Sequence, residues 1–439
     1  MEKEKYTSPI EDLRIVDFGD ARLNKRLKKS TDERITNRGK TRSSAKGFYR
    51  LLSNEKFDFS KMEEACQKST LKRICEYERV LLIQDTSDIN LNGHKKTEGL
   101  GYCSNNIKGI KIHNCLAVSE EGLSLGLLSQ TYETRLENKS SLSEWEKKSR
   151  PIEEKESYRW VETLKKTIEL VPREVETIMI CDREGDIYEL YEEARELKSD
   201  FVIRTAQDRK TETSDKIFAK IRKSPSIGYA TIEIPRDTEK KRKARKAIMA
   251  VSSCCVRISK KKNSSSLNLV RIVEINNATD EPIEWILSTS LPVETSEDAM
   301  TVVQYYVQRW KIERFHYILK SGCKVEEIQQ RSVERILPVI LICSMIANFI
   351  LALTSFARIM PDADCDLFLE EDEWKLLYRF AKRTKIPPDK PYSLAEAIKM
   401  FGQLGVGKRA PSDGDYGVKA VWLGLKAFYI AMDILMGQV

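Results

Sequence analysis

The chain has 439 residues, with 75 Lys and Arg against 67 Asp and Glu and three His, for a formal net charge of +8. That length predicts two to four domains. With 41% hydrophobic and 32% charged residues, the composition excludes collagen-like, mostly disordered and small disulfide-stapled chains. Residues 1–80 hold 20 basic and 14 acidic side chains, which is most of the charge excess. A basic end on a near-neutral body indicates a polyanion partner such as nucleic acid.

The cysteine pattern and the N-terminal residues indicate the cellular compartment. The ten Cys include no CxxC pair, which argues against a structural zinc site and for reduced thiols. The first ten residues, MEKEKYTSPI, lack the apolar core of a signal peptide. We therefore expect a cytoplasmic protein, associated with the nucleoid when bound to DNA.

Residues 1–75 predict short helices with polar breaks and form the first expected domain. Arg22 and Arg26 belong to a basic cluster on the first helix. This pattern fits a helical DNA-binding domain, with Arg22 and Arg26 as contacts, and it equally fits a solvated helix face.

Residues 76–210 predict a mixed sheet with helices, the first part of a catalytic core. Two apolar runs, Val80–Ile83 and Thr177–Cys181, predict buried strands that stop at Asp85 and Asp182. Ligand sites collect beyond the carboxyl ends of parallel strands, so the two carboxylates would meet there. The other expected elements are a hairpin at 112–131, helices at 156–170 and 186–197, and a strand at 201–204. This order predicts a ribonuclease-H-like core.

The rest of the chain predicts three further parts. Residues 211–295 alternate in polarity and predict an antiparallel β insertion, whose basic links fit either solvated hairpin tips or DNA contacts. Residues 296–360 would complete the core, and 361–439 would form a helical C-terminal domain. Within the core, 336–353 is long and apolar enough for a membrane span, but Pro338, Ser344 and Asn348 interrupt it. We expect a buried core helix and no membrane partner.

The helix expected at 298–320 carries the most informative spacing. At about 100° per residue, Tyr306, Arg309, Glu313 and Lys320 fall within about 60° of one another. Val307, Ile312, Phe315, Ile318 and Leu319 would then form the buried side. A solvated salt-bridge face would give a similar row, so this helix alone does not decide between the two.

Three carboxylates now share one expected destination: Asp85, Asp182 and Glu313. Such oxygen ligands suit Mg²⁺, and two ions could stabilise the attacking and leaving oxygens of phosphodiester cleavage. Arg309 and Lys320 would contact neighbouring phosphates.

Several segments resemble the Asp-Asp-Glu transposases of the insertion-sequence-four group, which includes the transposon-five transposase. The resemblance runs in order over about residues 13–330. Matching segments are Phe18–Leu23, Gly47–Arg50, Gln84–Thr86, Cys181–Ile187, Phe201–Arg204, Glu284–Leu287 and the Tyr-x2-Arg-x3-Glu-x6-Lys signature at 306–320.

The resemblance implies a cut-and-paste DNA transposase, acting as a homodimer on transposon ends and target DNA. It implies Asp85, Asp182 and Glu313 as catalytic ligands of two Mg²⁺ ions, with Mn²⁺ able to substitute. It also implies end contacts by Tyr306, Arg309, Lys320 and Arg204, and a Trp285 that takes part in base flipping during hairpin formation.

Other readings stay open at this point. A ribonuclease-H-like nuclease without strand transfer would need the same carboxylates, and an inactive relative could act as a repressor. Residues 402–409 fit GxxxxGK but carry Arg409 where a phosphate loop needs Ser or Thr. We expect a glycine loop that ends a helix there.

Overall fold

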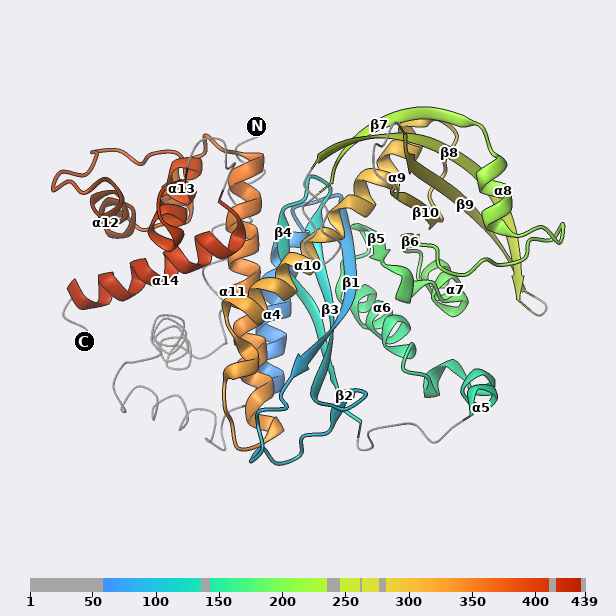
Figure 1. Ribbon diagram of the computed structural model, residues 1–439, viewed down its shortest axis with the longest axis horizontal. Helices are drawn as coiled ribbons and strands as arrows, with labels where there is room; N and C mark the ends of the chain where they lie inside the picture. The colour runs from blue at the N-terminus through green and yellow to red at the C-terminus, as the bar shows by residue number, and fades with distance from the viewer. Residues whose placement is uncertain are drawn as a thin grey trace. The chain divides into compact units, whose positions relative to one another are not determined.

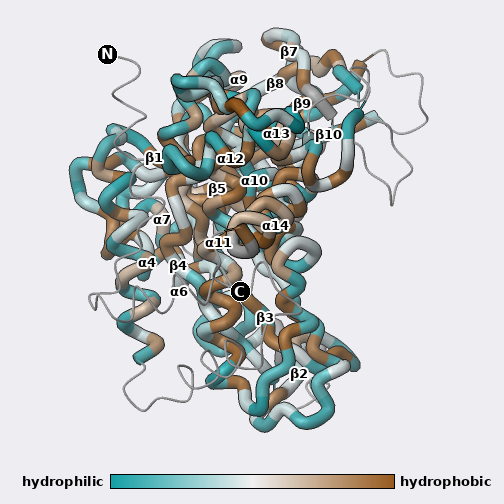
Figure 2. The backbone as a smooth tube through the Cα atoms, turned by 90° about the vertical axis from the view of Figure 1, so that its left-hand side faces the viewer, coloured by the Kyte–Doolittle hydropathy of each residue, from teal (hydrophilic) through white to brown (hydrophobic). Residues whose placement is uncertain are grey.

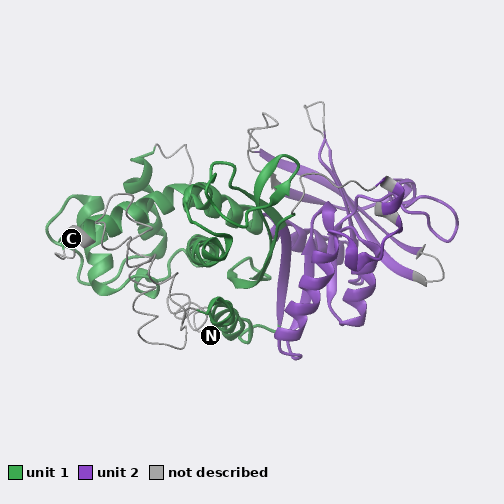
Figure 3. Ribbon diagram, turned by 90° about the horizontal axis from the view of Figure 1, so that it is seen from below, with its two compact units in different colours: residues 1–78, 86–141, 311–439 green, residues 79–85, 142–310 purple. Residues whose placement is uncertain are grey.

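The computed structural model describes residues 58–135, 143–234, 245–260, 263–275, 282–409 and 416–435. Arg22, Arg26 and most of the basic link at 240–246 lie outside these ranges. By its contacts the chain divides into two compact units, coloured in Figure 3. Unit 1 comprises residues 1–78, 86–141 and 311–439, and unit 2 comprises 79–85 and 142–310.

Unit 2 is built on a mixed sheet with the strand order β1-β5-β6-β10-β9-β8-β7 (Figure 1). The pairs β1-β5 and β5-β6 are parallel, and the later pairs are antiparallel. The strands are β1 (Arg79–Asn90), β5 (Glu176–Cys181), β6 (Asp200–Arg204), β7 (Ser226–Ile234), β8 (Arg245–Lys260), β9 (Asn263–Glu274) and β10 (Glu284–Thr289). The β-rich part expected at 211–295 is thus a run of antiparallel strands that returns to β6.

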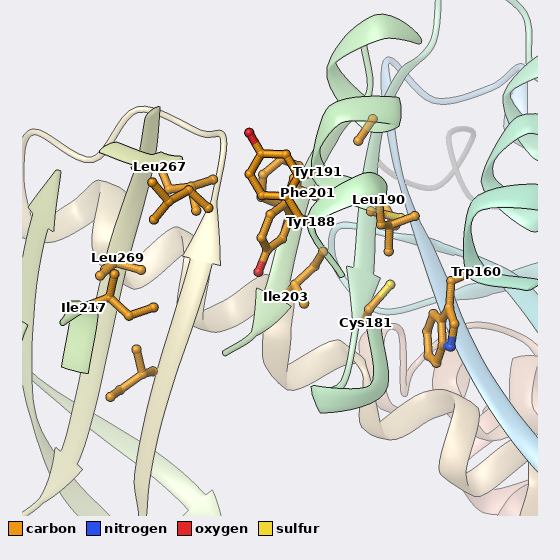
Figure 4. Close-up of a cluster of buried hydrophobic side chains, with 14 of the residues drawn as sticks. Trp160, Cys181, Tyr188, Leu190, Tyr191, Phe201, Ile203, Ile217, Leu267 and Leu269 are labelled. Atoms are coloured by element: carbon orange, nitrogen blue, oxygen red, sulfur yellow. The ribbon is translucent and has the colours of Figure 1, made fainter. Parts of the chain in front are cut away.

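Three helices of unit 2, α6, α7 and α8, cover one face of this sheet around a common apolar core. Trp160 of α6, Leu190 of α7 and Cys181 of β5 belong to this core (Figure 4). Leu164 of α6 and Met179 of β5 belong to the same cluster. Because side chains alternate along a strand, residues of the opposite parity in β5 face the other side of the sheet. The helices are α5 (Glu144–Ser149), α6 (Tyr158–Leu170), α7 (Tyr188–Glu196), α8 (Ile217–Lys223) and α9 (Ser296–Gln308).

Unit 1 combines a long hairpin with helices. Gly122, at φ 93°, lies in the turn between β3 and β4, in the left-handed region that glycine favours. The second half of β1 adjoins β3 at its far end, where Leu91 N donates to Lys108 O at 2.8 Å. The strands are β2 (Tyr102–Ser104), β3 (Ile107–Ser119) and β4 (Ser124–Glu133), and β3 pairs with both β2 and β4.

The apolar segment expected as a core helix is α11 (Val333–Ile359), labelled in Figure 2. By length and composition it could cross a membrane, but 83% of its most apolar window is buried inside the protein. The remaining helices of unit 1 are α4 (Phe59–Ile74), α10 (Trp310–Tyr317), α12 (Glu371–Lys382), α13 (Leu394–Val406) and α14 (Val418–Leu435). Of these, α14 was not predicted from the sequence.

The strand orders agree with a ribonuclease-H-like core: β1, β5 and β6 are parallel in unit 2, and β3 and β4 form an antiparallel hairpin in unit 1. The predicted fold class, an α/β protein with a mixed-sheet core, an antiparallel insertion and C-terminal helices, is confirmed. Residues 402–406 are the end of α13, and Gly407, at φ 84°, follows its last residue, so the glycines here end a helix, as expected.

Two predicted boundaries are wrong. The strand expected to stop at Asp85 continues to Asn90, because its polar second half gains a partner in β3 that a local pattern cannot reveal. The single helix expected at 298–320 is divided into α9, α10 and a π-helical turn at Ile318–Gly322, with the first break at Arg309.

Candidate active site

The register of the parallel strands sets Asp85 beside Asp182. The last printed pair between β1 and β5 is Ile83 with Ile180, and both carboxylates lie two residues further on. Neighbouring strands are about 4.8 Å apart, so the two residues face each other across one strand spacing. They share the parity of Ile83 and Ile180, and therefore point away from the α6 and α7 core. The predicted meeting of the two Asp is supported within unit 2.

The same row continues onto β6 and β10. Cys181 pairs with Ile203, so the next residue, Arg204, lies opposite Asp182. Arg204 in turn pairs with Leu287, and Trp285 lies two residues from Leu287, on the same face. The Arg204 guanidinium is 5.9 Å from the centre of the Trp285 ring, within cation–π range. Across four neighbouring strands, one face of the sheet thus carries two aspartates, an arginine and a tryptophan.

Helix α9 covers this row with Tyr306 and ends at Arg309. The Tyr306 ring meets Trp285 edge-on, with ring centres 5.2 Å apart. The Arg309 guanidinium is 5.7 Å from the Tyr306 ring centre, and its Nη1 is 3.8 Å from an Asp85 carboxylate oxygen. Both charged side chains of this ion pair are largely buried, at 14% and 17% exposed. Arg309, expected as a DNA contact, is therefore also a partner of Asp85.

The predicted burial of the signature helix is wrong at two positions, Tyr306 and Val307. Tyr306 is 3% exposed, whereas Val307, expected on the buried side, is 39% exposed. Burial raises the pKa of Tyr306, and the nearby Arg309 and Arg204 guanidinium groups partly oppose that rise. Burial also lowers the pKa of Arg204. The site is thus partly closed, and it concentrates positive charge around the two acids.

Asp186, which the sequence did not single out, anchors the loop that follows Arg204. This buried carboxylate accepts hydrogen bonds from the backbone N–H groups of Ala206 and Gln207, each at 2.6 Å. Tyr191 and Arg209 also bond to it. It lies in the conspicuous segment Cys181–Ile187, but nothing in that local pattern separates an anchor from a ligand.

Glu313 and Lys320 belong to unit 1. Glu313 lies on α10, and Lys320 lies in the π-helical turn, so the α-helical spacing used to align them holds only through Tyr317. Helix α10 is fixed by a buried polar network in which His316 Nε2 is 2.8 Å from Asn114 Nδ2. Asn114 Oδ1 accepts a hydrogen bond from Gln130, and Gln130 also donates to Ser344 of α11. This network sets the rotation of the helix that carries Glu313.

The donor set of unit 2 suits a hard divalent cation. Two carboxylates on adjacent strands supply the oxygen ligands that Mg²⁺ prefers. The Arg309 guanidinium already lies against one of them, so this position accommodates positive charge. Within the described ranges, no cluster of three or more His, Cys, Asp or Glu side chains is close enough to hold one metal ion. The acidic pair fits a metal ion, and the third ligand remains a proposal.

Comparison with known proteins gives the class to which this arrangement corresponds. Residues 159–349 match the family model described as the transposase DDE domain. Residues 345–434 match the model of the transposase Tn5 dimerisation domain. The resemblance to Asp-Asp-Glu transposases of the insertion-sequence-four group is therefore confirmed. Proteins of this family generally use divalent metal ions.

One solved structure is also similar, described as the cryo-EM structure of a piggyBac transposase synaptic complex with hairpin DNA. It shares 11% sequence identity, with a TM-score of 0.35. The match covers 67% of this chain and 52% of that one, so the present chain spans about half of its length.

Proposed function

We propose that this protein is a DNA transposase that catalyses cut-and-paste movement of its own element. The observation that carries the proposal is the pairing of Asp85 with Asp182 on one sheet face, with Arg309 against Asp85. Asp182 lies within the segment that matches a transposase DDE domain, and Asp85 precedes that segment in the sequence. A homodimer bound to double-stranded transposon ends, and later to target DNA, would be the working form.

The roles of the residues follow from their chemistry. Asp85, Asp182 and Glu313 would hold two Mg²⁺ ions, with Mn²⁺ as a substitute. When bound, these ions would supply an activated water and stabilise the leaving oxygen. Arg309, Arg204 and Lys320 would bind phosphates beside the cut, since guanidinium and ammonium groups form charge-assisted hydrogen bonds to phosphate oxygens.

Trp285 would stack its ring on a base that is flipped out of the transposon end. Flipping costs a few kcal/mol of stacking, and contact with an aromatic ring offsets part of that cost. The freed 3′-hydroxyl would then attack the opposite strand to form a hairpin. After the hairpin opens, the same hydroxyl would attack target DNA. Tyr306 would support Trp285 from behind, in keeping with its buried position.

The test is strand cleavage on duplexes that carry the DNA flanking this gene's own ends. We expect Mg²⁺-dependent nicking by the full chain and none by Glu313→Gln, with end binding by that variant mostly intact. Cleavage retained by Glu313→Gln would remove Glu313 from the proposed triad. Failure of the wild-type protein to bind those ends would overturn the transposase proposal as a whole.

The same reactions separate a transposase from its rivals. A nuclease without strand transfer would nick the ends but give no joined end–target product and no hairpin. An inactive relative acting as a repressor would bind the ends and leave them uncut. Denaturing gels of the reaction products distinguish the three outcomes.

A further inference from the structure

Three basic side chains of unit 1 converge where α10 meets the end of α11. Lys311 and Arg314 are three residues apart on α10 and therefore share one side of that helix. Lys311 Nζ donates a hydrogen bond to Ser355 Oγ of α11 at 3.2 Å. Arg358 follows Ser355 by three residues, in the last turn of α11. Arg358 interacts electrostatically with both Lys311 and Arg314, so the three cations lie near one another.

No carboxylate balances this cluster among the residues that the structure describes. None of the three side chains forms an ion pair there, and the Ser355 hydroxyl is the hydrogen-bond partner of Lys311. Lys311 and Arg314 are partly buried. Partly buried like charges without a counterion are unfavourable, so a cluster of this kind calls for an anion.

A purely structural account covers only part of the cluster. A cation in the last turn of a helix interacts favourably with the helix dipole, which suffices for Arg358 alone. It gives no reason for two further cations to come to the same place from another helix. Two arginines and a lysine around one point are, by contrast, the donor set that suits a phosphate group.

We propose that Lys311, Arg314 and Arg358 together bind one backbone phosphate of double-stranded DNA. The proposal rests on the DNA transposase function proposed above. At about 100° per residue, Lys311 lies about 160° and Arg314 about 100° around α10 from Glu313. The phosphate would therefore belong to a nucleotide away from the cut, and its role would be to position the strand.

The experiment measures binding of the full chain to a duplex carrying one of the gene's own ends, over a series of salt concentrations. The variants are Lys311→Gln, Arg314→Gln, Arg358→Gln and the triple combination. Lys399→Gln on α13 removes an exposed charge from the same unit and is the matched control. Arg358→Lys keeps the charge and controls for packing.

We expect the triple variant to bind about tenfold more weakly or worse at fixed salt. The slope of log K against log salt should flatten by about 0.9, the value for one lost phosphate contact. Lys399→Gln and Arg358→Lys should keep the wild-type slope. Without DNA, the triple variant should melt at the wild-type temperature or above it, because mutual repulsion is removed.

A second measurement needs no triple variant. A series of duplexes is made, each with one neutral methylphosphonate linkage at a different position. The linkage at one position should weaken binding by the wild-type protein but not by Arg314→Gln. An unchanged salt slope in the triple variant, or no such position, would overturn the phosphate site. Wild-type protein that does not bind the duplex at all would overturn the transposase proposal instead, so the two failures are distinguishable.

Discussion

At the scale of single residues, Tyr306 and Val307 exchange the places that a helical wheel predicts for them. The buried residues of α9 include Ala299, Val302, Val303 and Tyr306, which is the spacing of one helix face. On α10 the buried side is set by Ile312, Phe315 and His316. The buried face therefore turns between the two helices, which break at Arg309. A prediction that assumes one continuous helix carries the face of α10 back onto α9 and misplaces Tyr306.

This correction has a direct consequence for stability. Tyr306→Ala should destabilise the protein by about 3–5 kcal/mol, because it empties a buried site against Trp285. Val307→Ala, at an exposed position, should cost less than about 1 kcal/mol. Urea unfolding of the two variants checks this. Tyr306→Phe keeps the ring and should stay close to wild type, and equal losses at 306 and 307 would contradict the burial described above.

At the scale of elements, α10 is fixed by hydrogen bonds rather than by apolar packing alone. His316 is 8% exposed and contacts Asn114 on β3. Burial, and to a lesser extent the charge of Lys320, lowers the pKa of His316 to about 3. The imidazole is therefore neutral in the folded protein at ordinary pH. This neutral form holds the element that carries Glu313 against the hairpin of unit 1.

The depressed pKa predicts how stability depends on pH. An unfolded His has a pKa of about 6.5, so between about pH 6.5 and pH 3 the unfolded chain binds the extra proton and the folded chain does not. The contribution of His316 is full above pH 6.5 and is lost as pH falls towards 3, by up to about 1.4 kcal/mol per pH unit. Unfolding free energies at pH 7.5, 6.0 and 5.0 should fall more steeply in wild type than in His316→Gln. Parallel curves would count against a neutral buried His316.

At the scale of the whole molecule, the glycines of the C-terminal helices allow close packing within unit 1. A Cβ on Gly424 of α14 would lie 1.7 Å from the Phe401 carbonyl oxygen of α13. Both helices fall within the match to the transposase dimerisation domain. Gly405, inside the GxxxxGK match, therefore serves helix packing: a Cβ on it would lie 2.1 Å from the Ala420 carbonyl oxygen.

Enlarging Gly424 should separate these helices. Gly424→Leu is expected to cost about 1–3 kcal/mol or more through overpacking, and to weaken self-association of the full chain. Gly417→Ala, where an added Cβ meets nothing within 4 Å, is the matched control and should change little. Thermal melting and sedimentation measure the two effects. If Gly424→Leu associates as the wild type does, the proposed dimer does not depend on the packing of α13 against α14.

The amino-acid sequence by itself determined the local features of this protein. These features depend on neighbouring residues, and the structure has them where the patterns placed them. They are the short apolar strand before Asp182, the alternating strands of the insertion and the apolar core helix. The order of motifs also sufficed to indicate the transposase family. The Asp-Asp-Glu triad, the DNA contacts, the domain boundaries and the cytoplasmic location remain predictions.

Only the tertiary structure decided which distant residues meet. Whether Asp85 lies beside Asp182 depends on a register between strands almost a hundred residues apart, and a shift of one residue would turn one of them to the other face. The burial of Tyr306 depends on a helix break, and the contact of Lys311 with Ser355 depends on the packing of two helices. Local periodicity encodes an element and its faces, whereas register and packing depend on both partners at once.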